Sequence, residues 1–143
     1  MPKISRQGTN RCFGCGLDNP IGLKLSFEQC DGRVMTEFTP SEWHQGWPGY
    51  VHGGILFTLL DEAMGYTFYP DGVDGVTAKA EVRFRRPAPI GEVLIVEAAV
   101  SKKTKRLIES RATISLRDGT LVAEGKALMY VVGMARKDGE ARP

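Results

Sequence analysis

The chain has 143 residues, 19 of them Lys or Arg and 17 Asp or Glu, with a formal net charge of +2 at pH 7. This length suits one domain with its own hydrophobic core, and we predict a single domain over 1–143, with an N-terminal arm over 1–21 and a frayed tail over 136–143. The small excess of positive charge argues against a nucleic-acid-binding surface. The polar N-terminus, with no apolar run behind it, argues against a signal peptide or a spanning helix, so we expect a cytoplasmic protein that does not bind membranes.

Three cysteines, an odd number, argue against a disulfide framework and fit a reducing compartment. Cys12 and Cys15 form a C-x-x-C motif, which can be half of a zinc site or a redox pair. A zinc site usually needs four ligands, and besides this pair the chain offers only Cys30, His44 and His52. We therefore favour a turn in the N-terminal arm with reduced thiols, and we expect no metal.

Two N-terminal stretches, 22–28 and 33–38, carry apolar residues at two-residue spacing on either side of Asp31-Gly32. This pattern predicts a β-hairpin. The proline-containing segment 39–49 predicts a loop that leads to the next element.

A long helix is predicted from about Gly54 to Tyr69, and Pro70-Asp71-Gly72 would end it. The helix is apolar nearly all round, which suits burial by a curved sheet better than packing on a flat surface. Three alternating stretches and a fourth after Asp118-Gly119 predict further strands over 76–86, 92–103, 106–116 and 120–132. One long helix beside five or six antiparallel strands is an α+β arrangement in which the sheet wraps the helix.

The predicted helix start carries the candidate site, His52-Gly53-Gly54 followed after six residues by Asp61. A Gly-Gly step lets the backbone approach another group without a Cβ in the way, and the free N–H groups of a starting helix favour a negative or polarised atom. Asp61 lies about two turns further on, at ~3.6 residues per turn, among apolar neighbours. Such a pattern suits an oxyanion site combined with a functional acid.

The same residues resemble the acyl-CoA thioesterases of the hotdog fold, in particular the phenylacetate-pathway thioesterases and the human thioesterase superfamily members. The resemblance extends to Cys12-Phe13-Gly14-Cys15-Gly16, to Gly46-Trp47-Pro48-Gly49 and to Arg86-Pro87, and it covers roughly Cys12 to Val132. It implies a hotdog fold, with a long central helix wrapped by a curved antiparallel sheet of five to six strands. It also implies hydrolysis of an acyl-CoA to the free acid and coenzyme A, without a cofactor, by a homodimer or a dimer of dimers.

The resemblance also assigns roles to individual residues. In the family, the acid that matches Asp61 attacks the thioester or activates water, and the N–H that matches Gly53 polarises the carbonyl. Thr77 matches a hydroxyl residue that assists the acid. The next acid, Glu62, is rotated by ~100° around the helix and cannot face the same pocket, so we assign it a structural role.

The role of His52 stays open between a general base and a structural cap of the loop, and we favour the structural role. Several relatives carry an Asn in the loop before this histidine, whereas the present chain has His44-Gln45-Gly46. Either Gln45 or His44 substitutes for it, or water is placed otherwise.

Strand alternation after the helix defines two faces. One face would present Thr77, Lys79, Glu81, Arg83 and Arg85, and the other would pack Ala78, Ala80, Val82 and Phe84 on the helix. Guanidinium groups suit the phosphates of coenzyme A, although charged residues are also ordinary on an exposed strand face. On the phosphate-binding interpretation the substrate contacts come from Arg83, Arg85 and Arg106, with Lys105 beside the last of these, and from Gly54 at the helix start.

Two other functions fit the fold. One is a non-catalytic module that binds acyl-CoA, and the other is a dehydratase acting on a hydroxyacyl thioester. The dehydratase would need a histidine paired with an acid across the dimer, for which the loop from His44 to Gly49 is a candidate. The spacing of Gly-Gly and Asp61 favours a hydrolase over both.

Overall fold

The computed structural model describes residues 3–4, 8 and 11–134. Its elements are β1 (Glu28–Cys30), β2 (Arg33–Phe38), the short 3-10 helix η1 (Glu42–His44), α1 (Gly53–Tyr66), the 3-10 helix η2 (Tyr69–Asp71), β3 (Val73–Phe84), β4 (Leu94–Lys103), β5 (Leu107–Leu116) and β6 (Leu121–Met134). The tail predicted over 136–143 and parts of the arm lie outside the described residues. None of the helices in the described part of the chain has the length and apolar character needed to cross a membrane.

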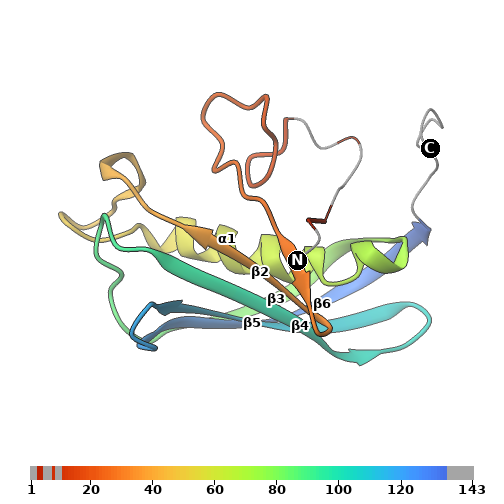
Figure 1. Cartoon of the computed structure of the whole chain (residues 1–143). Coiled ribbons are helices and arrows are strands. Elements are labelled where there is room, and N and C mark those ends of the chain that lie inside the picture. The colour runs from red at the N-terminus through yellow and green to blue at the C-terminus, as the bar shows by residue number, and fades with distance from the viewer. Residues whose placement is uncertain (1–2, 5–7, 9–10, 135–143) are drawn as a thin grey trace.

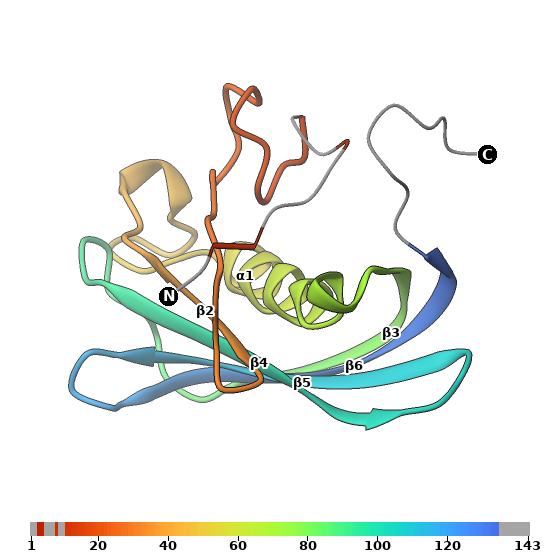
Figure 2. The same ribbon diagram turned by 45° about the vertical axis from the view of Figure 1, so that its right-hand side comes forward.

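The six strands form one sheet in the order β1-β2-β4-β5-β6-β3, and every neighbouring pair is antiparallel. Between β2 and β3 the chain passes through α1, so β3 joins the far edge of the sheet beside β6. The sheet curves beneath the helix (Figures 1 and 2). The predicted α+β arrangement, a central helix wrapped by a curved antiparallel sheet, is confirmed.

The first predicted strand is mostly wrong, because only Glu28–Cys30 pairs with β2. The N–H groups of Leu23 and Leu25 donate instead to the carbonyl oxygens of Phe13 and Gly14 in the arm, at 2.8 and 2.9 Å. Between them Lys24 has a φ of 54°, which interrupts the extended backbone. The apolar alternation in this stretch therefore reflects packing on the helix rather than strand pairing.

The helix starts one residue earlier and ends three residues earlier than predicted. At its end the hydroxyl of Thr67 donates to the carbonyl of Met64 at 2.7 Å, and a 3-10 turn follows. Gly72, with a φ of 72°, then reverses the chain into β3. The later strands lie within three residues of the predicted limits.

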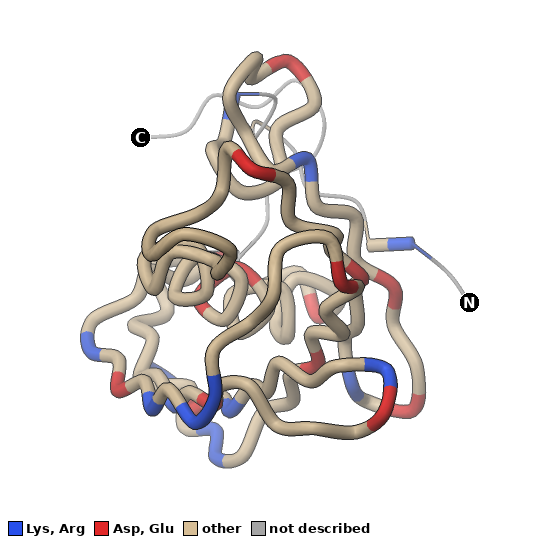
Figure 3. The backbone as a smooth tube through the Cα atoms, turned by 90° about the vertical axis from the view of Figure 1, so that its left-hand side faces the viewer, with Lys and Arg blue, Asp and Glu red and all other residues tan. Residues whose placement is uncertain are grey.

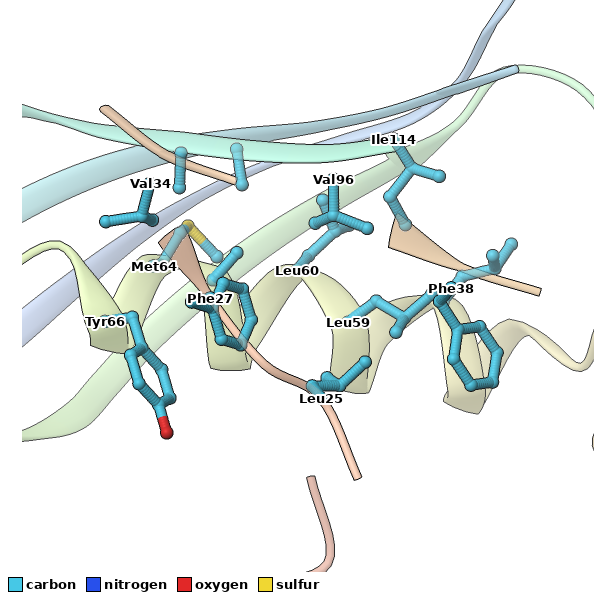
Figure 4. Close-up of a cluster of buried hydrophobic side chains, with 14 of the residues drawn as sticks. Leu25, Phe27, Val34, Phe38, Leu59, Leu60, Met64, Tyr66, Val96 and Ile114 are labelled. Atoms are coloured by element: carbon cyan, nitrogen blue, oxygen red, sulfur yellow. The ribbon is translucent and has the colours of Figure 1, made fainter. Parts of the chain in front are cut away.

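The core lies between α1 and the concave face of the sheet. Leu59, Leu60 and Met64 have no exposed surface, and Val96 and Ile114 meet them from β4 and β5. Figure 4 shows Leu60 and Met64 directed towards the sheet, where Val34 also lies. Fully burying a side chain of this size contributes ~1.5 to 3 kcal/mol, so this helix–sheet contact is the main source of stability.

The arm and the segment 22–27 that follows it cover the other side of α1, away from the sheet (Figures 1 and 2). The ring of Phe27 stacks on Tyr66 with 4.3 Å between centroids, and Leu25 is also buried there. The apolar helix is thus enclosed from two sides, which explains why its sequence has no polar face.

Candidate functional site

The start of α1 is organised by His52, which is the N-cap residue. Its Nδ1 accepts the N–H of Gly54 at 2.8 Å, so the neutral ring carries its proton on Nε2. His52 therefore has a structural role as the N-cap of α1. The Gly54 N–H is used in this cap, whereas Gly53 is the first residue of the helix, where an α-helix leaves the N–H without an intrahelical partner.

The loop before the helix holds His52 in position. The N–H of His52 donates to the carbonyl of His44 at 2.9 Å. The His44 ring accepts the N–H of Ser41 at 2.9 Å, and the Gln45 side chain accepts the N–H of Gly49 at 3.1 Å. His44 and Gln45, the two residues considered as substitutes for the missing Asn, thus form hydrogen bonds within the loop itself. Burial lowers the pKa of His44, which favours its neutral form.

A groove of about 460 Å³ opens at the helix start. Its walls are mainly apolar and aromatic, and are formed by Trp47, Tyr50, Val51, Gly53, Leu56, Phe84, Arg85, Arg86, Pro87 and Ala88. A Cβ added at Gly53 would lie 3.6 Å from the Phe84 ring, which is ordinary contact. Gly53 therefore lies in the wall of an apolar groove, where a fixed N–H donor would stabilise an oxyanion most strongly.

Asp61 lies on α1 facing β3, and its carboxylate accepts the hydroxyl proton of Thr77 at 2.8 Å. The Asp61 side chain is half-buried, and Thr77 is exposed. The two residues matched to the acid and its assisting hydroxyl are thus in direct contact. Asp61 is eight positions after Gly53, so their backbones are ~12 Å apart along the helix.

The expected faces of β3 are wrong at its beginning. The register against β6 shifts between Thr77 and Lys79, so that Thr77 lies opposite Met129 and Lys79 lies opposite Leu128. Ala78 is the extra residue of this β-bulge, and the bulge turns Thr77 onto the helix face with Ala80. A regular strand would have directed the Thr77 hydroxyl away from Asp61.

The predicted arginines do not form one patch within the chain. Arg83 lies on the outer face of the sheet, outside the groove lining. Arg85 lines the groove, and its Nε pairs with Glu124 at 3.0 Å, while Arg86 lines the groove beside it. Figure 3, seen from the helix start, shows basic and acidic positions interspersed along the sheet.

Arg106 is at the opposite end of the sheet. The Arg85 N–H bonds to β6 at Val122, whereas the Arg106 carbonyl bonds to β6 at Val131. Nine residues of strand separate these two contacts, about 30 Å at ~3.3 Å per residue. Within one chain, Arg106 therefore cannot join Arg85 at the same phosphate.

The arm meets the helix at Glu62, on the side turned away from Asp61. The thiol of Cys12 donates to the Glu62 carboxylate at 3.4 Å. Burial raises the pKa of the Cys15 thiol to about 11, with a hydrogen bond from Tyr66 acting against the shift and the Glu62 charge adding to it. None of the three cysteines is in a disulfide.

The model of the thioesterase superfamily matches residues 48–123, which contain the loop end, the helix and most of the sheet. The chain belongs to the thioesterase superfamily. This match covers more than half of the sequence, including the Gly53 and Asp61 segment.

Individual relatives of this superfamily extend the match. The chain is 30% identical over 119 residues to acyl-coenzyme A thioesterase THEM4 from Mus musculus, covering 81% of this chain and 51% of the relative. It is also 30% identical over 98 residues to human acyl-coenzyme A thioesterase 13, covering 66% of this chain and 70% of the relative. The chain spans only about half the length of the THEM4 proteins it matches.

Among solved structures, protein RHA08564, a thioesterase superfamily protein, superposes with a TM-score of 0.80. The identity is 29%, over 85% of this chain and 60% of that one. The hotdog fold expected for a thioesterase of this superfamily is confirmed.

Sequence reasoning missed two features of this superfamily member's site. Phe84 was assigned to the helix-packing face without its place in the groove wall, next to Gly53. The contact between Cys12 and Glu62 was missed too, because residues fifty positions apart give no periodic signal. The Gly14 between the two cysteines was the available clue, since a glycine inside a motif often marks a close approach.

We predict that His52→Ala lowers the free energy of unfolding by ~0.5 to 2 kcal/mol, because the Gly54 N–H loses its acceptor. His52→Asn should recover most of this loss, since Asn is a good N-cap residue. Urea denaturation at one protein concentration measures both variants. Equal destabilisation by Ala and Asn would contradict the capping role, and loss of activity in a stable His52→Asn variant would favour the general base.

Proposed function

We propose that this chain hydrolyses an acyl-CoA thioester to the free acid and coenzyme A. The observation that carries the proposal is the hydrogen bond between the Asp61 carboxylate and the Thr77 hydroxyl, on the helix that also begins at the apolar groove. The names of the relatives, acyl-coenzyme A thioesterases in mouse and human, support the same reaction. A Streptococcus pneumoniae thioesterase structure of this fold, at 24% identity, contains coenzyme A.

The proposed chemistry requires an acid in its ionised form and a donor for the carbonyl oxygen. The Asp61 carboxylate either attacks the thioester carbonyl or takes a proton from the attacking water, and the Thr77 hydroxyl fixes its orientation. The N–H of Gly53 stabilises the negative charge that develops on the carbonyl oxygen. The C–S bond breaks, and the thiolate of coenzyme A takes up a proton.

One chain cannot supply both groups to the same carbonyl. Donor and acid must each lie about 3 Å from the reacting atoms, whereas Gly53 and Asp61 are ~12 Å apart along α1. We therefore propose that the site forms between two chains, Gly53 of one facing Asp61 and Thr77 of the other. Such a homodimer, alone or as a dimer of dimers, would also cover β3, whose free edge exposes Val76.

The cysteine composition supports placing this enzyme in a reducing compartment such as the cytoplasm. No cofactor is required by the proposed reaction, since water is the only second reactant.

We predict that Asp61→Asn folds normally and lowers kcat for thioester hydrolysis by at least ~100-fold, because an amide neither attacks nor accepts a proton at neutral pH. Release of free thiol from a panel of aliphatic and aryl acyl-CoA esters measures the rate. Glu81→Gln, which removes a carboxylate from the outer face of β3, is the matched control and should keep full activity. An active Asp61→Asn variant would exclude this mechanism, and a wild-type chain that binds the esters without hydrolysing them would favour the non-catalytic module.

We also predict partial rescue when two inactive variants exchange subunits. Gly53→Pro removes the N–H donor at a helix position that tolerates proline, and Asp61→Asn removes the acid. Random pairing should restore about a quarter of wild-type activity, because half the dimers are mixed and each has one intact site. Gly53→Ala, which keeps the N–H, controls for the added Cβ, and no rescue after exchange proven by mass spectrometry would contradict the shared site.

A third prediction concerns the nucleotide end of the substrate. Arg86 lies in the groove wall and is exposed, so Arg86→Gln should raise KM for an acyl-CoA by up to ~5-fold, for a contact of up to ~1 kcal/mol. KM for a pantetheine thioester without the phosphates should not change. Arg85→Gln should act more weakly because its guanidinium already pairs with Glu124, and Arg83→Gln, outside the groove, is the control. Equal effects on both substrates would contradict phosphate binding here.

A further inference from the structure

A cluster of two thiols and a carboxylate joins the N-terminal arm to α1. One ligand atom each from Cys12, Cys15 and Glu62 lies within 4.8 Å of the others. Within the cluster, Cys12 Sγ and Glu62 Oε1 are 3.4 Å apart. Cys15 is buried, and Cys12 and Glu62 are half-buried.

The backbone of the arm is shaped to bring these three groups together. The N–H of Gly16 donates to the carbonyl of Cys12 at 2.9 Å, which closes a turn and places both thiols on one side. Between them, a Cβ on Gly14 would lie 2.3 Å from Glu62 Cδ, so the Glu62 side chain occupies space that only glycine leaves open. Substituting Gly14 would therefore move the carboxylate or the arm.

The three groups of the cluster all become negative when they ionise. The groups that act on the Cys15 thiol are the Glu62 carboxylate, the Cys12 thiol and the Tyr66 hydroxyl. Two thiolates and a carboxylate held this close together repel one another, and a divalent cation between them would offset that repulsion.

We propose that Cys12, Cys15 and Glu62 bind a thiophilic divalent cation such as Zn²⁺. In a tetrahedral site with Zn–S of ~2.3 Å and Zn–O of ~2.1 Å, neighbouring sulfur and oxygen ligands are ~3.6 Å apart, close to the contact between Cys12 and Glu62. Thiolates select zinc over magnesium or calcium, which prefer oxygen ligands. Binding releases the thiol protons, and water completes the coordination.

The remaining cysteine and both histidines are engaged elsewhere. Cys30 lies on β1 near Asp31, the His44 ring accepts from Ser41, and the His52 ring caps the helix. These three residues were the further ligands expected from the sequence, and no metal was expected on that ground. The fold adds a ligand of another type, because the arm is laid across the helix at Glu62.

Metal content can be measured without any assay of hydrolysis. A failure of this proposal can therefore be distinguished from a failure of the proposed function. The full-length chain is stripped with EDTA under reducing conditions, dialysed, and titrated with Zn²⁺ against a chromophoric chelator. Co²⁺ serves as a spectroscopic probe, because thiolate coordination gives a charge-transfer band in the near ultraviolet. We expect one ion per chain, the thiolate band, and a higher melting temperature with Zn²⁺ than without it.

Three variants and one control locate the site. Cys12→Ser and Glu62→Gln change half-buried groups with little change of size, and each should weaken Zn²⁺ binding by more than the ~10- to 100-fold typical of residues that only orient a ligand. Cys15→Ser should do the same, and circular dichroism checks that this buried variant folds. Cys30→Ser is the matched control and should bind like the wild type.

Several outcomes would overturn the proposal. These are failure of the wild-type chain to take up Zn²⁺, loss of binding in Cys30→Ser, and unchanged binding in Glu62→Gln. A chain isolated with Cys12 and Cys15 joined, two hydrogen masses lighter and unable to bind Zn²⁺ after reduction, would assign the pair to redox chemistry instead.

Discussion

The burial of α1 is the constraint on which the rest of the structure depends. A helix with apolar residues on nearly every side is unstable in water unless it is covered all round, and a sheet can cover only one side. The curved six-stranded sheet supplies that side through residues such as Val96 and Ile114, and the segment 22–27, which follows the arm, supplies the other through Phe27. This segment is thus part of the core, although it contains no regular secondary structure.

The burial of α1 also determines where the groups of the candidate site can lie. Its first residue, Gly53, lines an apolar groove, while Asp61, two turns later, contacts Thr77 of β3. The helix is rigid over this distance, so donor and acid cannot approach each other within one chain. In the proposed mechanism, a second subunit is needed because of this helix geometry, and not because of any surface property.

Most of the fold could be predicted from the sequence because its signals are local. The apolar run from Gly54 onwards and the alternation of the later strands reflect burial on one face, which repeats with a fixed period. The prediction of the first strand was wrong for a physical reason. The backbones of Leu23 and Leu25 bond to the arm and not to β2, although their side chains are buried just as in a strand. Alternation records burial and does not record the hydrogen-bond partner.

The site was predictable to the extent that it is encoded in a motif. Asp61, Thr77 and Gly53 came from spacing and resemblance, and the structure brings Asp61 and Thr77 into contact. The face of Thr77 could not be derived, since one extra residue in a strand leaves no mark in composition or hydropathy. Arg106 was grouped with Arg83 and Arg85 as a further cation for the phosphates, but the sequence does not say at which end of the sheet its turn lies.

The β-bulge at Ala78 has a consequence for how the sequence of this chain can change. The side that the Thr77 hydroxyl faces is determined by the number of residues in the strand, and not by the identity of any side chain there. The direction of Thr77 therefore depends on the presence of a residue at position 78 and not on its side chain. Deletion of this one alanine would reverse the direction of the Thr77 side chain without removing any functional group. Single-residue substitutions would not reveal that dependence.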